Sequence, residues 1–250
     1  MISLPDWHRR YTQQAGWTQS LRNYLYNLCN LAEARSVLEV GCGTGVILQD
    51  LLAYAKPTRL VGVDIEVTKA RFASRFSPQA HLVTADANAL PFDTGIFDVT
   101  LCHFFLMWVD APAALMEMKR VTAPGGILLA LAEPDYGGRI DYPDALAELG
   151  QWQARALQEQ GADPLMGRKL RALFSEAGLQ AIQSGVIGGQ WQDSPAREEL
   201  DLEWCVLRSD LQHRVNGQHL NFLEELDRQA WKKGTRVLFV PTFYAMGIVP

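Results

Sequence analysis

The segment "VLEVGCGTGVILQDL" at residues 37–51 decides the fold expected for this sequence. Gly41, Gly43 and Gly45 follow an apolar run and lead directly into a segment with helical spacing. Glycine lets the backbone approach a ligand closely, and the start of a helix offers free N–H groups. A phosphate or a nucleoside fits such a loop, and a glycine turn without any ligand contact is the alternative.

Short apolar runs alternate with helical segments along the chain, which is the pattern of a parallel sheet built from strand and helix units. The expected strands are 36–40, 59–65, 81–86, 97–104 and 125–134, then a weaker 179–189 and a last 235–247. Helical spacing covers 7–30, 47–55, 114–121, 142–161, 167–178 and about 194–233. These patterns indicate one large α/β domain rather than two independent ones.

Composition favours a small-molecule partner. The net charge of -5 and the pI near 5.6 argue against a surface that neutralises nucleic-acid phosphates. The four cysteines, Cys29, Cys42, Cys102 and Cys205, form no CxxC pair and no short Cys/His spacing typical of a metal site. We therefore expect free thiols, no metal and a reducing compartment.

The N-terminal residues lack the apolar core of a signal peptide, and no apolar run approaches the length of a membrane span. A cytoplasmic, soluble protein without a membrane span is the expectation from these absences.

Two carboxylates extend the interpretation of the glycine loop. Asp64 ends the second expected strand, where it can accept hydrogen bonds from ribose hydroxyls, and Asp86 ends the third. The dinucleotide pattern G-x-G-x-x-G is incomplete, because Val46 stands where it needs its last glycine. Both aspartates are also explained if they only cap the turn that follows each strand.

The ordered motifs resemble those of the class I S-adenosylmethionine-dependent methyltransferases. They are "VLEVGCGTG" (37–45), "VGVDI" (61–65), "ADANALPF" (85–92), "FDVTLCHFFLMWV" (97–109) and "MKRVTAPGGILLALAEP" (118–134). The sequence is most similar to the branch with ubiquinone/menaquinone-type and many small-molecule methyltransferases. The resemblance covers roughly residues 36–135.

Together with the strand pattern, the resemblance implies an α/β fold of the Rossmann-like, doubly wound type. Its mostly parallel seven-stranded sheet has helices on both faces and an antiparallel last strand. We expect one domain over 1–250, made of a helical lid (1–35), a cofactor-binding core (36–135) and a C-terminal half (136–250) with a helical cap at about 194–233.

The resemblance implies S-adenosylmethionine as the cofactor, and its site residues follow motif by motif. The residues that would line the methionine moiety are Glu39, which braces the loop, and Gly41, Cys42, Gly43 and Gly45. The nucleoside would contact Asp64 through its ribose, and Ile65, Asp86 and Ala87 through its adenine. Cys102 and His103 would lie beside the sulfonium.

We also expect residues of the lid and of the acceptor site in two further segments. Tyr11 and Trp17 belong to an aromatic series in the N-terminal segment that would cover the cofactor. After the fifth strand, Asp135, Tyr136 and Arg139 would meet an acceptor, with Arg139 pairing an anionic group. The aromatic residues that would wall an apolar acceptor pocket are Trp191, Trp204, Phe243 and Tyr244. Ordinary core packing is the alternative for each of these aromatic residues.

Methyl transfer is an in-line displacement, so the protein mainly aligns the reactants and excludes water. A general base is optional, and His103 is the one histidine among the motifs that would suit the role. The sequence thus favours methyl transfer from S-adenosylmethionine to a small-molecule acceptor. One alternative is an NAD-dependent oxidoreductase, but the sequence contains no recognisable Tyr-x-x-x-Lys signature. The other is a non-catalytic S-adenosylmethionine-binding protein.

Overall fold

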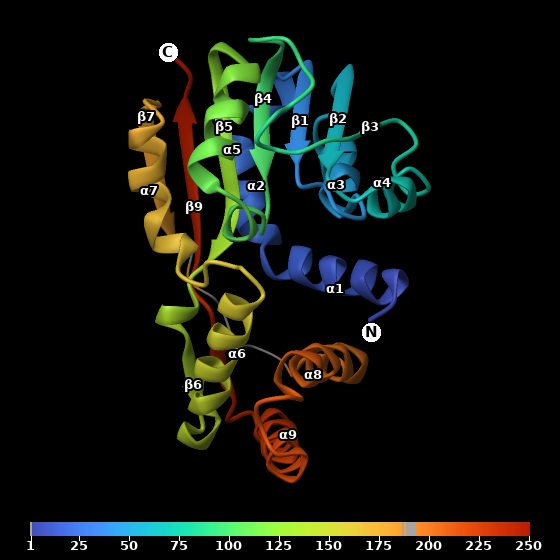
Figure 1. Cartoon of the computed structure of the whole chain (residues 1–250), viewed down its shortest axis with the longest axis vertical. Coiled ribbons are helices and arrows are strands. Elements are labelled where there is room, and N and C mark those ends of the chain that lie inside the picture. The colour runs from blue at the N-terminus through green and yellow to red at the C-terminus, as the bar shows by residue number, and fades with distance from the viewer. Residues whose placement is uncertain (1, 187, 189–193) are drawn as a thin grey trace.

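A seven-stranded sheet with the order β3-β2-β1-β4-β5-β9-β7 forms the upper part of the computed structural model (Figure 1). Its strands are β1 (Ser36–Val40), β2 (Arg59–Asp64), β3 (His81–Thr84), β4 (Phe97–Cys102), β5 (Thr122–Pro134), β7 (Gln180–Val186) and β9 (Thr242–Ile248). β9 runs antiparallel to both of its neighbours, and the pairs among β1 to β5 are parallel. The predicted sheet is confirmed. The structure describes residues 2–186, 188 and 194–250.

Helices cover both faces of the sheet, as predicted. The helices are α1 (Leu4–Trp17), α2 (Gln19–Leu28), α3 (Val46–Tyr54), α4 (Val67–Ala73), α5 (Ala111–Val121), α6 (Ala147–Glu159), α7 (Met166–Glu176), α8 (Arg197–Leu211) and α9 (Gly217–Lys232). One core cluster joins the sheet to α5 and α7, and a second joins it to α2 and α3. Within the described residues, no helix is long and apolar enough to span a membrane.

The strand order changes direction between β1 and β4. From β1 the chain builds outward to β2 and β3, and then crosses to β4 and β5 on the other side. In doubly wound sheets a ligand crevice opens at this switch point, outside the carboxyl ends of the strands. The glycine loop after β1 and the segment after β4 therefore flank the expected site.

Three expected boundaries differ in the structure. The N-terminal helical segment is divided at Thr18 into α1 and α2, and the cap is divided into α8 and α9. The last expected strand, 235–247, is also two strands. Its first part, β8 (Val237–Phe239), leaves the main sheet and pairs with β6 (Ile140–Tyr142). Pro241 lies between β8 and β9, and proline has no N–H to continue a ladder of hydrogen bonds.

A buried ion cluster holds the cap together. Asp141 accepts hydrogen bonds from Arg139 at 2.6 Å and from Arg236 at 2.7 Å. Arg236 also pairs with Asp227 at 2.6 Å, and the Trp204 indole donates to the same carboxylate at 2.9 Å. The cluster joins β6, α8 and α9. Loss of any one member would leave a buried charge without its partner and would destabilise the cap.

Replacing Arg236 with methionine should destabilise the protein by about 3–5 kcal/mol, because it leaves the buried carboxylate of Asp227 without its cation and removes one of the two cations that pair with Asp141. Urea unfolding would measure the loss. Arg197→Met is the matched control, since the Arg197 side chain is 87% exposed, and it should change stability by less than about 0.5 kcal/mol. Equal unfolding midpoints for the two variants would contradict the assigned role of the cluster.

Candidate functional site

The glycine loop is tied to the end of the neighbouring strand. Gly41, Gly43 and Gly45 have φ values of 75°, 52° and 82°, a region that side chains with a Cβ rarely adopt. The N–H groups of Gly41 and Cys42 both donate to the Val63 carbonyl, at 2.8 and 2.9 Å. The loop therefore keeps one conformation at the carboxyl edge of β1 and β2.

Aromatic rings of the chain itself cover the bare backbone of this loop. A Cβ on Gly41 would lie 2.2 Å from Cδ2 of Phe105, which belongs to the segment after β4. A Cβ on Gly43 would lie 3.2 Å from Cε2 of Tyr11 on α1. The missing side chains thus make room for two rings, which form the walls of any ligand site along the loop.

Glu39 on β1 is the buried acid of the site. Its side chain is nearly inaccessible, and among the described residues its Oε2 has no hydrogen-bond partner. Burial raises the pKa of Glu39 to about 8; Asp64 adds to the rise and the Arg22 guanidinium opposes it. An unpartnered buried carboxyl at the ligand edge suits a cationic ligand group, because a cation would satisfy it.

The two strand-end aspartates lie at the same edge and make local hydrogen bonds. Asp64 accepts from the N–H of Gly43 at 2.8 Å and from the N–H of Glu66 at 2.9 Å. Asp86 accepts from the N–H of Asn88 at 2.9 Å. Both therefore do cap the following turn, and each carboxylate oxygen has a second lone pair for a ligand.

Beside Asp64, the side chain of Ile65 is 68% exposed and offers an apolar face. Ala87, the other residue expected at the adenine, is buried directly after Asp86. The four residues predicted to contact the nucleoside therefore lie at the carboxyl ends of β2 and β3, along one edge of the sheet.

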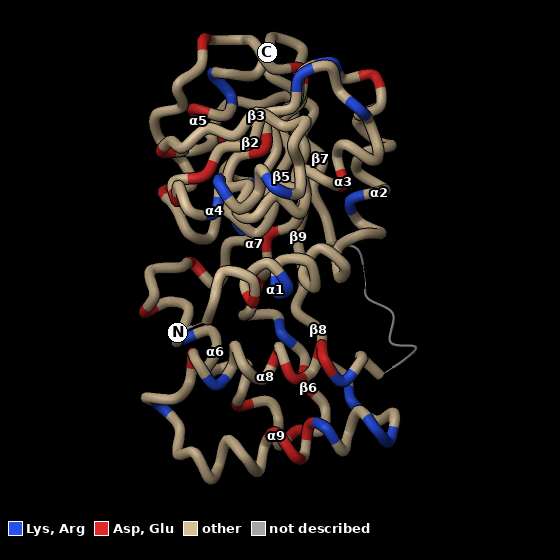
Figure 2. Tube along the Cα trace, turned by 90° about the vertical axis from the view of Figure 1, so that its right-hand side faces the viewer, with Lys and Arg blue, Asp and Glu red and all other residues tan. Residues whose placement is uncertain are grey.

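Helix α1 lies between the glycine loop and the cap (Figure 2). On one face, His8 Nδ1 is 2.8 Å from Thr44 Oγ1 in the loop, and the Tyr11 ring covers Gly43. On the opposite face, Arg10 pairs with Glu203 of α8, and the Gln13 amide donates to the Glu199 carbonyl at 3.1 Å. This helix is therefore fixed to both layers.

Trp17 differs from the expectation that it covers the cofactor. Its side chain is 57% exposed, and the guanidinium of Arg10 lies 4.7 Å above its ring. Arg10 and Trp17 are seven residues apart on one helix, so they lie on the same face of α1. Tyr11 lies on the other face.

His103 contacts the junction of α1 and α2. Its Nε2 is 2.8 Å from Thr18 Oγ1, which also accepts a hydrogen bond from Arg22 at 2.7 Å. Burial, and then the Arg22 charge, lowers the pKa of His103 to about 3. The imidazole is neutral at pH 7 and is a weak base. Cys102 is fully buried at the end of β4, and burial raises the pKa of its thiol well above its ordinary value. Its place beside the sulfonium stays a prediction.

The residues predicted to contact an acceptor are mostly held by internal partners. Arg139 pairs with Asp141 and donates to Gln153, so its guanidinium already has partners within the chain. Its contact with an anionic acceptor stays a prediction. The buried carboxylate of Asp135 pairs with Arg168 of α7, and its contact with an acceptor likewise stays a prediction. Tyr136 is half-buried against the core, and burial raises the pKa of its hydroxyl.

The aromatic residues expected around an acceptor pocket do not form one wall. Trp204 is buried in the core of the cap, and Phe243 packs against the backbone of Gly167. Tyr244 contacts the ring of Tyr24, with 6.1 Å between ring centroids. Trp191 lies outside the described residues.

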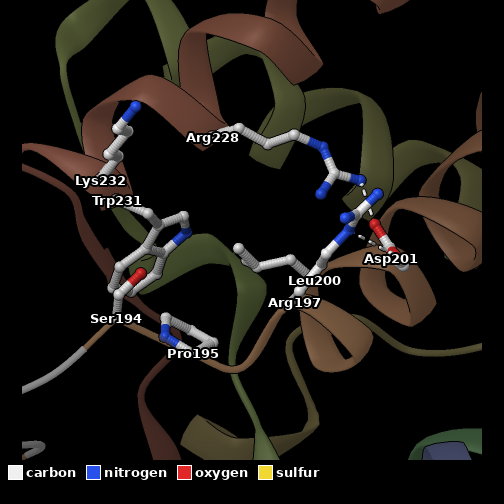
Figure 3. A pocket seen from close by; sticks show the side chains of 8 residues that line it. All are labelled: Ser194, Pro195, Arg197, Leu200, Asp201, Arg228, Trp231 and Lys232. Carbon is white, nitrogen blue, oxygen red and sulfur yellow. Dashed lines mark ion pairs between the residues drawn. The ribbon is translucent and has the colours of Figure 1, made fainter.

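A hollow of about 700 Å³ lies in the cap, between the start of α8 and the end of α9 (Figure 3). Trp231, Leu200 and Pro195 line it, and Arg228 pairs with Asp201 at 2.7 Å along one side. Among the described residues, none of those predicted for the cofactor or the acceptor lines this hollow, so it is separate from the glycine loop.

Arg22 and Phe105 are site residues that sequence reasoning missed. Arg22 is 3% exposed and sits where its charge acts on both Glu39 and His103. A cation on the apolar face of α2, between Leu21 and Leu25, was the available signal. No local pattern marks Phe105, because its contact with Gly41 depends on the folded sheet.

Comparison with known proteins shows what this chain is similar to in sequence and in fold. Residues 38–130 match the family model described as a methyltransferase domain. A solved structure from Thermotoga maritima, described as a SAM-dependent methyltransferase and possible histamine N-methyltransferase, superposes with a TM-score of 0.59 at 16% identity. It covers 98% of this chain and 96% of that chain. The fold is that of the class I methyltransferases.

Curated relatives match part of their own length. A 37.1 kDa protein in transposon TN4556 of Streptomyces fradiae is 30% identical over 208 residues, or 79% of this chain and 59% of that protein. Demethylmenaquinone methyltransferase of Mycolicibacterium gilvum is 38% identical over 119 residues, or 47% of this chain and 48% of that enzyme. The chain thus spans about half to three fifths of the length of these relatives.

The raised pKa of Glu39 predicts a pH dependence of stability. Between the ordinary value of 4.5 and about 8, the folded protein keeps a proton that the unfolded chain releases. The free energy of unfolding therefore falls as pH rises through this range. Glu39→Gln removes this titration, so its stability relative to the unmodified protein should increase from pH 5 to pH 8 by about 3 kcal/mol.

Urea unfolding at both pH values measures this difference. Other titrating groups, such as Glu133, are common to the two proteins and cancel in the comparison. Parallel stability curves for the two proteins would show that Glu39 does not titrate in this range.

Proposed function

We propose that this protein transfers a methyl group from S-adenosylmethionine to a small-molecule acceptor. The observation that carries the proposal is the unpartnered buried carboxyl of Glu39 beside a left-handed glycine loop, at the switch point of the sheet. A cofactor with an ammonium group, a ribose and an adenine matches the donors and acceptors along this edge. The methyltransferase-domain match over 38–130 supports the same reading.

The residues present fit this cofactor. Glu39 would accept from its ammonium group, and Asp64 would take the ribose hydroxyls through its remaining lone pairs. Ile65 would pack on the adenine, and Asp86 would accept from the adenine amino group. The bound cofactor supplies a sulfonium that is a good leaving group.

Helix α1 is proposed as the lid of this site. Tyr11 and His8 on its inner face contact the glycine loop, so the helix would exclude water from a bound cofactor. A water-poor cavity favours displacement at the sulfonium, because the attacking group does not keep a hydration shell there.

His103 is proposed as a residue that holds the lid, rather than as a general base. A base with a pKa near 3 removes protons poorly at neutral pH, and its Nε2 is engaged with Thr18. We therefore propose an acceptor whose attacking atom has a free lone pair at neutral pH, such as an amine or an ionised oxygen. The oxidoreductase alternative gains no support, because Val46 replaces the glycine that a dinucleotide fingerprint needs.

Calorimetric titration tests the cofactor assignment. Asp64→Ala should weaken S-adenosylmethionine binding about ten- to a hundredfold, because hydrogen bonds to a charged group are lost. Asp86→Asn should weaken it less, and should scarcely affect an analogue without the adenine amino group. NAD should not bind the unmodified protein. Absence of S-adenosylmethionine binding to the unmodified protein would refute the proposed function.

The role of His103 predicts a modest kinetic effect. With an acceptor found by screening for S-adenosylhomocysteine formation, His103→Ala should lower turnover less than about tenfold and leave the pH profile unchanged. Thr18→Val should have a similar effect, since it removes the same contact. Thr12→Val is the control on the exposed part of α1 and should have no effect. A hundredfold loss together with a lost acidic limb in His103→Ala would instead assign a general base.

A further inference from the structure

The segment after β4 carries one wall of the candidate site in a constrained conformation. Phe104 has φ 50°, in the left-handed region, and the next residues form the short helix η2 (Leu106–Trp108). The ring of Phe105 lies against the backbone of Gly41. A non-glycine residue at such a φ costs free energy, so other contacts must stabilise the conformation of this segment.

One buried carboxylate at the end of β5 holds it. Oε1 of Glu133 accepts hydrogen bonds from the N–H groups of Phe105 at 2.8 Å and Leu106 at 2.9 Å, and Oε2 accepts from Met107 N–H at 3.3 Å. These are consecutive amides at the start of a short helix, where N–H groups have no partner within the helix. Glu133 is completely inaccessible to solvent.

A carboxylate is suited to this place by its geometry. It offers two acceptor oxygens, whereas the amide of glutamine offers one oxygen and an NH₂ group that would face a backbone donor. The Phe104 N–H also donates to the Ala132 carbonyl at 2.9 Å, so the end of β5 contacts four successive amides of the segment.

We propose that Glu133 is a positioning residue for the cofactor site: by binding the amides of residues 105–107 it sets the Phe105 ring against the glycine loop. The loop-holding part stands on the hydrogen bonds alone. The effect on S-adenosylmethionine rests on the proposed function.

The surroundings of Glu133 leave the amides as its main partners. On β4, Cys102 is an uncharged thiol, and on β9 the residue opposite Glu133 is Phe243. Arg168 of α7 is paired with Asp135. Burial raises the pKa of Glu133 to about 7 and the three amides oppose that rise, so its charge is supported by hydrogen bonds rather than by a cation.

Glu133→Gln tests the proposal, with Asp98→Asn as the matched control. Asp98 also accepts hydrogen bonds from two backbone N–H groups, those of Arg35 and Ser36, but it lies at the opposite end of the strands.

Amide hydrogen exchange is measured without cofactor, and steady-state kinetics with S-adenosylmethionine. In Glu133→Gln the exchange of amides 105–107 should accelerate about tenfold or more. The KM for S-adenosylmethionine should rise about tenfold while kcat changes less than threefold. Asp98→Asn should change neither quantity.

Each other outcome overturns a stated part of the proposal. Unchanged exchange would refute the loop-holding role, and faster exchange with unchanged KM would refute the link to the cofactor. A lower kcat and melting temperature with unchanged KM would show a merely structural residue. If the unmodified protein does not bind S-adenosylmethionine, the proposed function fails while the exchange result still decides the loop-holding role.

A second variant covers the case in which Glu133→Gln does not fold. Phe105→Leu keeps the amides and removes the ring, so it should raise the KM for S-adenosylmethionine without altering exchange at 106 and 107. An unchanged KM in this variant would refute the positioning role of the ring.

Discussion

The carbonyl oxygen of Val63 holds the ligand edge of this protein together. It accepts hydrogen bonds from two successive amides, those of Gly41 and Cys42, and so ties the loop after β1 to the end of β2. The chain reaches this conformation only through left-handed positions, which is why glycines stand there. Asp64 continues the attachment by binding Gly43. Helix α1 and the Phe105 ring then pack on a backbone that is already fixed.

The sheet and its glycine loop could be predicted because local patterns specify them. Apolar runs such as 36–40 and 59–65 are short and separated by helical spacing, and this pattern is typical of parallel strands. The division of the expected strand 235–247 was missed although Pro241 signals it. Proline inside an expected central strand argues against continuous pairing, and here the chain passes from the β6–β8 pair to the main sheet at that point.

The contacts of the candidate site could be predicted only in part. The motif order correctly predicted that Glu39, Asp64 and Asp86 lie at or near the carboxyl ends of β1, β2 and β3. Their contacts with a cofactor stay a prediction. The pairing of Arg139 with Gln153 and of Asp135 with Arg168 joins separate elements of the C-terminal half, which no local pattern encodes. His103 likewise meets Thr18 across 85 positions of the chain. The role of a charged or polar side chain depends on such contacts with residues that are distant in the sequence. It therefore cannot be predicted from the residues next to it in the chain.

The position of β9 has a consequence for how the chain folds. β9 lies between β5 and β7, so β7 has no partner in the sheet until residues 242–248 have arrived. The cap helices α8 and α9 lie between β7 and β9 in the sequence. They must therefore leave a path by which β9 can enter the sheet. The five parallel strands that carry the glycine loop pair without β9 and can assemble as an early unit, because their contacts are closer in sequence. Insertion of β9 is therefore the step that closes the sheet, and an incomplete chain exposes the edge of β5 as a site for association with other strands.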